Sequence, residues 1–422
     1  MNRAWLAALV LLPALVVGEE FRFDIGQYEK KPYEFGGYLQ ASGEHQVLDR
    51  DAALYALNFP DQQPGSTQRY RAVAELGGMY RWERVSAHGL FHGEVVDDYA
   101  GTGHSGSVYE AYLAAQPAES WRLEAGKRSL RWGKGYAFSP VAFLERPRDP
   151  TDPELAREGF VMGVGSYVKS FAGDLQTLTV TTVILPASDE INEDFGAADD
   201  DVNLAGRVSL LYRDTDIDLL FRAGDSRPDA LGVDFARNLA TNLVIHGELA
   251  WFDDRRHRVL DESGQLVSRE TDAFDLLFGL RYLTATETTW ILEYYRNGAG
   301  YSADEMERFY ALAREAADDP ILAELARSVR AAGYAVPQPM RDYLYIKVSQ
   351  KEPFGALYWS AGGTAIVNLD DGSASIIPEV VHTGIKDWEL RGRLALTTGG
   401  TNTDFGERQN DWRLELRARW FF

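Results

Sequence analysis

Hydrophobic and polar residues alternate along most of this chain, in segments of about 8 to 14 residues. Alternation with a period of two gives a strand with one apolar and one polar face. The clearest segment is 412–422. Its apolar face carries Trp412, Leu414, Leu416, Ala418, Trp420 and Phe422, and its polar face carries Arg413, Glu415, Arg417 and Arg419. The pattern predicts an all-β protein.

The connectors between these segments alternate in length. Short ones are expected near 83–85, 117–120, 171–175, 213–216, 238–241, 284–287, 350–354 and 383–386. Longer ones are expected near 43–67, 99–106, 132–157, 187–201, 225–230, 254–270, 298–340, 369–371 and 398–410, of which 369–371 is unusually short. They separate eighteen strands, or sixteen if the weak segment 231–238 is not a strand. Both ends of the strand array then lie on the side of the short turns.

Aromatic residues gather near the ends of the predicted strands. Examples are Tyr80, Trp82, Trp121, Trp251, Trp290, Tyr294 and Trp388. A soluble sandwich also alternates, but aromatic girdles at two interfaces are typical of transmembrane β-barrels, as are short inner turns opposite long outer loops. We therefore predict an antiparallel transmembrane barrel, with about eighteen strands.

One long connector is expected to contain its own helices. Ser302 and Glu305 form a capping-box pattern at the start of a helix. Asp319 and Pro320 start a second helix, with proline at its first position, and Gly333 ends it. This predicts a helical hairpin in the seventh outer loop.

The first residues are typical of a secretory signal. Arg3 precedes an apolar stretch from Ala4 to Val17, and Gly18 offers a small residue for cleavage. A transmembrane helix is the alternative, but the stretch is shorter than the roughly 20 residues that a bilayer core requires. We expect a signal peptide at 1–18 and a single barrel domain at 19–422.

Composition narrows the possible functions. The formal net charge of −21 disfavours nucleic-acid binding, and the absence of cysteine excludes disulfides and covalent c-type haem. His88 and His92 share a strand face but stand about 13 Å apart, too far to chelate one metal ion. No hydrolase or phosphate-loop motif occurs. We expect no enzyme activity, cofactor or metal, although the acidic loop 187–201 leaves calcium binding open.

Strand alternation also predicts which charged residues face the lumen. The candidates for the pore lining are Arg128, Arg131, Arg391, Arg393, Arg413, Arg417, Arg419, Glu389 and Glu415. The opposite register would turn five arginines of the last two strands toward lipid, at about 2–4 kcal/mol each near the midplane. Arginine rings favour anions, so we expect a mild preference for anionic or carboxylated solutes. An arginine–glutamate ladder without selectivity is the alternative.

The final residues Arg419-Trp420-Phe421-Phe422 resemble the C-terminal signature of Gram-negative outer-membrane proteins. With the stretch 123–133, Leu-Glu-Ala-Gly-Lys-Arg-Ser-Leu-Arg-Trp-Gly, the chain resembles porins, closest to substrate-specific and alginate-export-type barrels. The resemblance implies a passive channel for small solutes in the outer membrane, in contact with lipid and lipopolysaccharide and inserted by the barrel-assembly machinery. It leaves the oligomeric state open.

In porins the third outer loop commonly folds into the barrel, and here that loop is rich in charge and proline. The resemblance therefore implies a constriction loop whose charged residues are Lys134, Arg146, Arg148, Asp149, Asp152, Glu154 and Arg157. An ordinary surface loop held by local ion pairs is the alternative. Two other functions stay open: a structural barrel that scaffolds a secreted or electron-carrying partner, and an outer-membrane hydrolase.

The last residue provides a test. Deleting Phe422, or changing it to Asp, is expected to reduce membrane insertion in cells, because the terminal aromatic belongs to the lipid-facing register of the last strand. The readout is the amount of heat-modifiable barrel in outer-membrane fractions. An unchanged amount would contradict this prediction, and Phe422→Tyr serves as the aromatic control.

Overall fold

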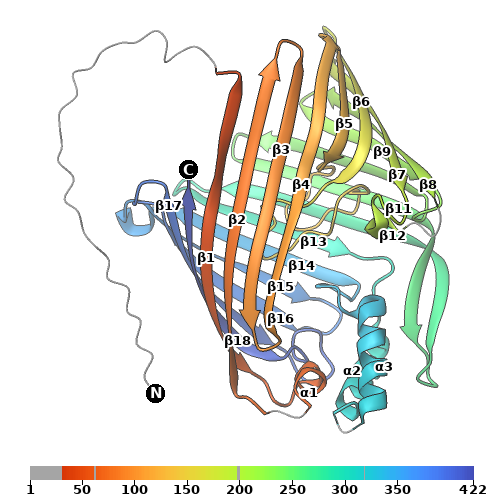
Figure 1. Cartoon of the computed structure of the whole chain (residues 1–422), viewed down its shortest axis with the longest axis vertical. Coiled ribbons are helices and arrows are strands. Elements are labelled where there is room, and N and C mark those ends of the chain that lie inside the picture. Colours follow the sequence, from red (N-terminus) through yellow and green to blue (C-terminus); the bar gives the residue numbers. More distant parts are fainter. Residues whose placement is uncertain (1–30, 61–62, 197–199, 318) are drawn as a thin grey trace. The chain divides into compact units, whose positions relative to one another are not determined.

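The computed structural model describes residues 31–60, 63–196, 200–317 and 319–422. Residues Tyr33–Phe422 form one compact unit built from a closed eighteen-stranded antiparallel sheet (Figure 1). The expected all-β barrel is therefore confirmed with eighteen strands, not sixteen, and the weak segment is strand β10. The proposed signal peptide at 1–18 lies outside the described residues.

The strands follow one another around the barrel in chain order. They are β1 (Tyr33–Leu48), β2 (Ser66–Trp82), β3 (Val85–Asp98), β4 (Gly101–Ala118), β5 (Trp121–Arg128), β6 (Phe160–Ser170), β7 (Leu175–Ala187), β8 (Asp201–Tyr212), β9 (Thr215–Ala223), β10 (Ala230–Ala240), β11 (Leu243–Leu260), β12 (Leu266–Leu283), β13 (Thr288–Arg296), β14 (Asp342–Lys351), β15 (Trp359–Asn368), β16 (Ala374–His382), β17 (Trp388–Thr398) and β18 (Asn410–Phe421).

The barrel closes between its first and last strands. β1 pairs with β18 in a register that sets Tyr38 opposite Phe421, and it pairs with β2 on its other side. Beyond the end of β18, Gly37 and Phe422 exchange backbone hydrogen bonds of 3.2 and 3.1 Å. Closure leaves no sheet edge unpaired. An unpaired edge in hydrocarbon would leave backbone N–H and C=O groups without hydrogen-bond partners. The last strand therefore closes the barrel against the first, which begins at Tyr33.

Two connectors are shorter than expected. β3 and β4 continue to Asp98 and Gly101, although 99–106 was expected to be a loop, because small Gly and Ser residues still form the ladder hydrogen bonds. β11 and β12 likewise extend to Leu260 and Leu266, although 254–270 was expected to be a loop. Their charged ends pair as a projecting hairpin, so their polarity reflects solvent exposure and not a lack of strand structure.

The two faces of the wall differ as the alternation predicts. Leu416 on β18 is 62% exposed on the outer face, whereas its neighbour Arg417 is 6% exposed and contacts a loop inside. Large apolar side chains such as Phe35, Leu231 and Phe274 are also exposed on the wall. An apolar surface of this extent is unfavourable in water and favours a lipid environment.

Helices lie at the end of the barrel with the long loops (Figure 1). The first outer loop contains α1 (Ala53–Asn58), and the seventh contains α2 (Ala303–Glu315) and α3 (Pro320–Val329), followed by a helical turn at Arg330–Tyr334. Ser302 and Glu305 form the expected capping box, and Asp319 caps α3. The expected helical hairpin is confirmed. Among the described residues, none of the helices combines the length and apolar character needed to cross a bilayer.

The outward register can be tested on β18. Leu416→Lys is expected to lower the free energy of unfolding in lipid by about 2–4 kcal/mol, because the new ammonium group would face hydrocarbon near the middle of the strand. Arg413→Lys on the inner face is the control and should change stability little. Denaturant titration in phospholipid vesicles measures both, and equal effects would contradict the assigned register.

Candidate functional site

The third outer loop, residues 129–159, connects β5 to β6 and lies inside the barrel. Its residues contact inward side chains of β9, β10, β11, β13, β14, β17 and β18. These strands occupy a large part of the wall away from β5. A loop that reaches all of them must cross the lumen.

Apolar packing holds one side of this loop. Trp132, Val141 and Phe143 belong to a buried cluster that includes Leu185 on β7 and Leu220 on β9. The inner face of β7–β11 is therefore apolar in part, and the loop covers it. Water is excluded from this contact, which fixes the loop against that side of the wall.

Glu248 on β11 is the main polar anchor of the loop. Its carboxylate accepts backbone hydrogen bonds from Lys134 and Gly135, both at 2.6 Å, and from Val141 at 3.2 Å. The Ser139 hydroxyl donates a further hydrogen bond of 3.0 Å. Glu248 is only 2% exposed. One buried carboxylate thus accepts from several loop donors, which would otherwise be buried without a hydrogen-bond acceptor.

Glu293 on β13, two strands further around the wall, is placed in the same way. Its carboxylate accepts from the backbone N–H groups of Tyr136 and Ala137, the latter at 2.9 Å. Nε2 of His246 lies 2.9 Å from the same carboxylate. The loop segment 134–141 therefore turns its backbone donors toward a wall of carboxylates.

An acidic row continues on the adjacent strands. Asp234 on β10 lies opposite Asp218 on β9 and opposite Glu248 on β11 in the strand registers. Nζ of Lys134 reaches this row, 3.1 Å from Asp218 and 3.8 Å from Asp234. The loop thus supplies both backbone dipoles and one ammonium group to an acidic half of the wall.

The opposite half is basic, and the loop meets it with an acid. Asp152 lies 3.0 Å from Arg417 and 3.6 Å from both Arg391 and Arg393. Burial alone would raise the pKa of the Asp152 carboxyl, but Arg393, Arg417 and Arg391 outweigh burial and hold that pKa below its ordinary value. The carboxylate therefore stays charged at neutral pH.

The other predicted loop residues mostly brace the loop itself. Arg148 donates to the carbonyl oxygens of Gly135 and Trp132, and Arg157 pairs with Glu145 at 2.6 Å. The remaining three act locally: Glu154 accepts from the Tyr136 hydroxyl, Asp149 caps a turn at Thr151, and Arg146 pairs with Glu158 and Asp194.

The predicted pore-lining residues of β17 and β18 divide into two groups. Arg391, Arg393 and Arg417 lie against the loop and are largely covered by it. The rest pair along the wall: Arg413 with Glu44, Glu389 with Arg391, Glu415 with Arg417, and Arg419 with Gln40 and the ring of Tyr38.

A cavity of about 650 Å³ lies toward the long-loop end of the lumen, between this loop, the projecting β11–β12 hairpin and the end of the helical hairpin. A second cavity, of about 460 Å³, lies between the loop and the wall of β3–β5 and β8.

Arg128, Arg131, Arg157 and Arg207 line the second cavity. Arg128 pairs with Glu124 and Arg157 with Glu145, but Arg131 and Arg207 form no ion pair with any described residue. Glu110 is the acid in this lining and accepts from the Ser129 N–H. Two unneutralised guanidinium groups make this cavity electropositive, although the whole chain is acidic.

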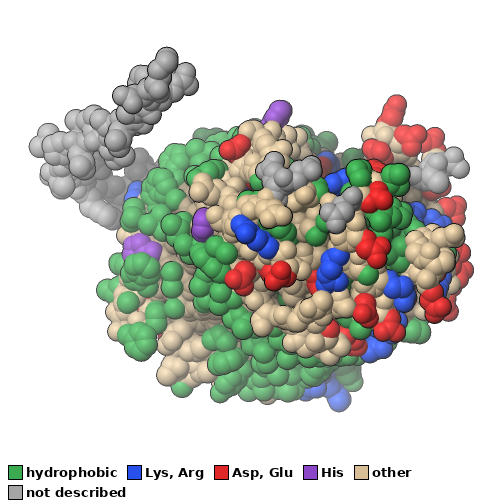
Figure 2. All heavy atoms as spheres, turned by 90° about the horizontal axis from the view of Figure 1, so that it is seen from below, with side chains coloured by type: hydrophobic (Ala, Val, Ile, Leu, Met, Phe, Trp, Pro, Cys, Tyr) green, Lys and Arg blue, Asp and Glu red, His purple; other side chains and the backbone are tan. Residues whose placement is uncertain are grey.

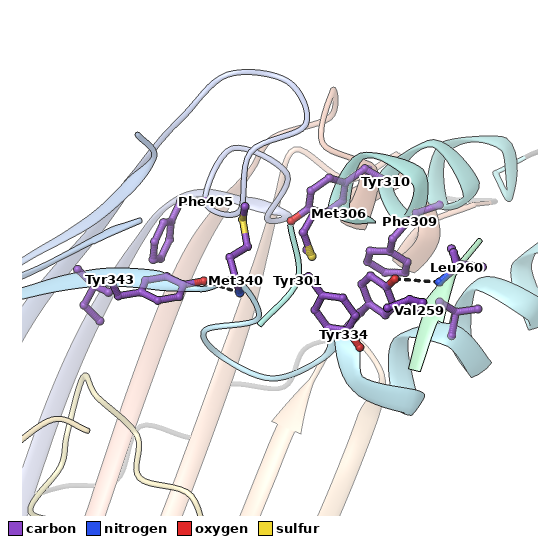
Figure 3. Close-up of a cluster of buried hydrophobic side chains, with 14 of the residues drawn as sticks. Val259, Leu260, Tyr301, Met306, Phe309, Tyr310, Tyr334, Met340, Tyr343 and Phe405 are labelled. Carbon is purple, nitrogen blue, oxygen red and sulfur yellow. Dashed lines mark hydrogen bonds between the residues drawn. The ribbon is translucent and has the colours of Figure 1, made fainter. Parts of the chain in front are cut away.

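The long-loop end carries a helical cap. Tyr301, Met306, Phe309 and Tyr334 form a buried apolar cluster with residues from α1, the β11 end and Phe405 (Figure 3). Figure 2 looks onto this end, where acidic and basic side chains gather toward one side of the face. Ala137 and Phe138 of the third loop belong to the same cluster, so the cap and the loop pack against each other.

Glu407 joins three outer loops within this cap. Its carboxylate, 1% exposed, pairs with Arg314 of α2 and accepts from the N–H groups of Ala53 and Asn402 at 2.6 Å each. This one carboxylate therefore links the first, seventh and ninth outer loops.

The acidic loop 187–201 is described except for 197–199. In its described part, Asp194 pairs with Arg146 and Asp201 accepts from Ser226. The one group of three or more clustered potential metal ligands among the described residues is elsewhere, at Asp253, Asp254 and Asp272, and it is exposed. Calcium binding by the acidic loop remains untested.

Several residues of the site escaped the sequence interpretation. Asp218 and Asp234 lie on the same inward register as Arg222, so the alternation could have placed them in the lumen. The same alternation places Glu248 and Glu293 in the lumen, but nothing in the sequence marks them as loop anchors. Glu407 sits in a predicted loop, where no periodicity indicates burial.

Solved outer-membrane barrels share this fold. A BenF-like porin from Pseudomonas fluorescens Pf-5 matches with a TM-score of 0.54 and 11% identity, over 92% of this chain and 98% of that chain. Pseudomonas aeruginosa OccK2 (OpdF) in complex with glucuronate matches with 0.52 and 12%, over 92% and 98%. The chain has the eighteen-stranded fold of Gram-negative outer-membrane porins.

A structure with another role also matches. Escherichia coli Wzi, an outer-membrane protein involved in group 1 capsule assembly and described as a carbohydrate-binding β-barrel, aligns with a TM-score of 0.51 and 13% identity, over 90% of this chain and 83% of that chain. No protein-family model matches the chain, and no curated protein matches it significantly. At these identities the likeness establishes the fold alone.

The anchoring role of Glu248 can be tested by proteolysis. Glu248→Ala is expected to expose the segment 134–148 to trypsin, because each buried N–H left without an acceptor costs about 1–3 kcal/mol. Glu248→Gln keeps one acceptor oxygen and should give an intermediate rate of cleavage. Glu262→Ala, in the exposed tip of the β11–β12 hairpin, is the control. Equal cleavage in all variants would show that apolar packing alone holds the loop.

Proposed function

We propose that this protein is an outer-membrane channel for small solutes, narrowed by the third loop and selective for anions. Three features support the proposal: the porin fold, an outer surface that suits lipid, and a loop that crosses the lumen between an acidic and a basic wall. Residues Lys134 and Asp152, which meet the two walls, are then constriction residues, whereas Arg148 and Arg157 keep the loop rigid.

The observation that carries anion selectivity is the electropositive cavity between the loop and β3–β5. Arg131 and Arg207 line this cavity and form no ion pair with any described residue. Their positive charge is therefore available to attract a mobile anion. The arginines of β17 and β18 contribute less, because Asp152, Glu379, Glu389 and Glu415 neutralise them. Arginine also binds carboxylates in a two-point geometry, which favours carboxylated solutes.

Changing both free arginines tests this proposal. Arg131→Gln with Arg207→Gln is expected to shift the reversal potential in a salt gradient toward cation selectivity, most clearly at low salt, where the screening length reaches about 30 Å at 0.01 M. Arg213→Gln, in a short turn with an exposed ion pair to Asp174, is the control. Planar-bilayer recording measures both. Cation selectivity in the unmodified protein, or no shift in the double variant, would contradict anion selectivity.

The helical cap favours a second candidate, a closed barrel that binds carbohydrate or a partner. The buried cluster and Glu407 tie three outer loops across the mouth, an arrangement that a scaffold tolerates better than a channel does. The same recordings separate the two. A conducting unmodified protein supports the channel, and a protein that conducts only after removal of residues 302–334 supports the closed barrel.

A further inference from the structure

The turn between β14 and β15, residues 352–358, differs from the other short turns at its end of the barrel. Phe354 is 108% exposed, and Leu357 and Tyr358 are exposed by 62% and 59%. Ile385 in the turn between β16 and β17 is also exposed, by 50%. In Figure 1 the turn stands out from the wall as the light-blue segment beside the β17 label. Apolar side chains are therefore presented outward, beyond the end of the strands.

The turn is held in this conformation by its own backbone. Glu352 N–H donates to Trp359 O at 2.7 Å, and Gly355 N–H donates to Glu352 O at 3.0 Å. Thr383 N–H of the neighbouring turn donates to Tyr358 O at 3.0 Å. The exposure of Phe354 is thus a property of an ordered turn.

Its backbone also adopts conformations that are unfavourable for bulky residues. Glu352, Phe354 and Tyr358 have positive φ values of 47°, 56° and 65°. Side chains with a Cβ rarely occupy this region, and an aromatic residue gains nothing there from local hydrogen bonding. The turn thus holds a phenylalanine in an unfavourable backbone conformation while its side chain is fully exposed.

The patch is continuous with the lipid-facing wall. Trp359 follows the turn directly and is exposed. Trp388 on β17 and Trp420 on β18, which are register partners of each other at the same end of the barrel, are exposed as well. Lys351 and Lys386 are exposed beside them. Aromatic rings together with lysines are the residues that settle at the boundary between hydrocarbon and headgroups.

We propose that the 352–358 turn is a membrane anchor that inserts Phe354, Leu357 and Tyr358 into the phospholipid headgroup region of the leaflet at the short-turn end. Insertion of this kind buries apolar side chains about 5–10 Å into the boundary zone. The proposal rests on the membrane location given under the proposed function. A protein partner fits less well, because four side chains fall far short of the roughly 1,200–2,000 Å² that a stable interface buries.

The absence of native cysteine makes a direct test possible. Phe354→Cys in the full chain is labelled with an environment-sensitive fluorophore and reconstituted into phosphatidylcholine–phosphatidylglycerol vesicles. Asp214→Cys, in the exposed turn between β8 and β9 at the same end, is the aqueous control. Leu416→Cys on the outer face of β18 is the lipid control.

Label at position 354 is expected to be quenched several-fold more by spin-labelled lipid headgroups than label at 214, and several-fold less by aqueous iodide. Label at 354 that behaves like label at 214 would overturn the anchor while leaving the channel proposal intact. Protection of label at 354 from both quenchers would indicate a protein contact and would also overturn it. Failure of lipid spin-labelled on its acyl chains to quench label at 416 would overturn the membrane location and the anchor together.

Discussion

Every strand of this barrel must have one face that suits hydrocarbon and one face that suits a charged interior, and the rest of the structure depends on this constraint. A closed barrel meets the backbone part of that demand, because the pairing of β1 with β18 leaves no free edge. The side-chain part is met by strict alternation, as between Leu416 and Arg417. Charges that cannot face lipid are concentrated inside, and a lumen filled with charge needs either water or a second layer of protein.

The third loop supplies that second layer. It is held less by its own sequence than by wall carboxylates, chiefly Glu248 and Glu293, which accept its backbone N–H groups. Asp152 then neutralises three arginines on the far side. The loop therefore pairs with charges on both sides of the lumen, whereas Arg131 and Arg207 form no ion pair with any described residue.

This redistribution changes how selectivity should be understood. Counting inward arginines along β17 and β18 suggests a basic channel, but those arginines are paired. Arg131 and Arg207 lie near β5 and β8, where the loop leaves the wall. The cap adds a second control at the mouth, since Glu407 joins three outer loops into one unit.

The sequence by itself determined the barrel, the inward register and the helical hairpin, and limited the strand number to eighteen or sixteen, because each depends on local periodicity or a local capping pattern. Arg417 could be assigned to the lumen from its neighbours alone. Only the tertiary structure decided that it lies beneath Asp152, that Glu248 anchors the loop, and that Arg131 and Arg207 stay unpaired. These contacts join residues more than 70 positions apart, and no local pattern encodes which charges will meet once the sheet closes.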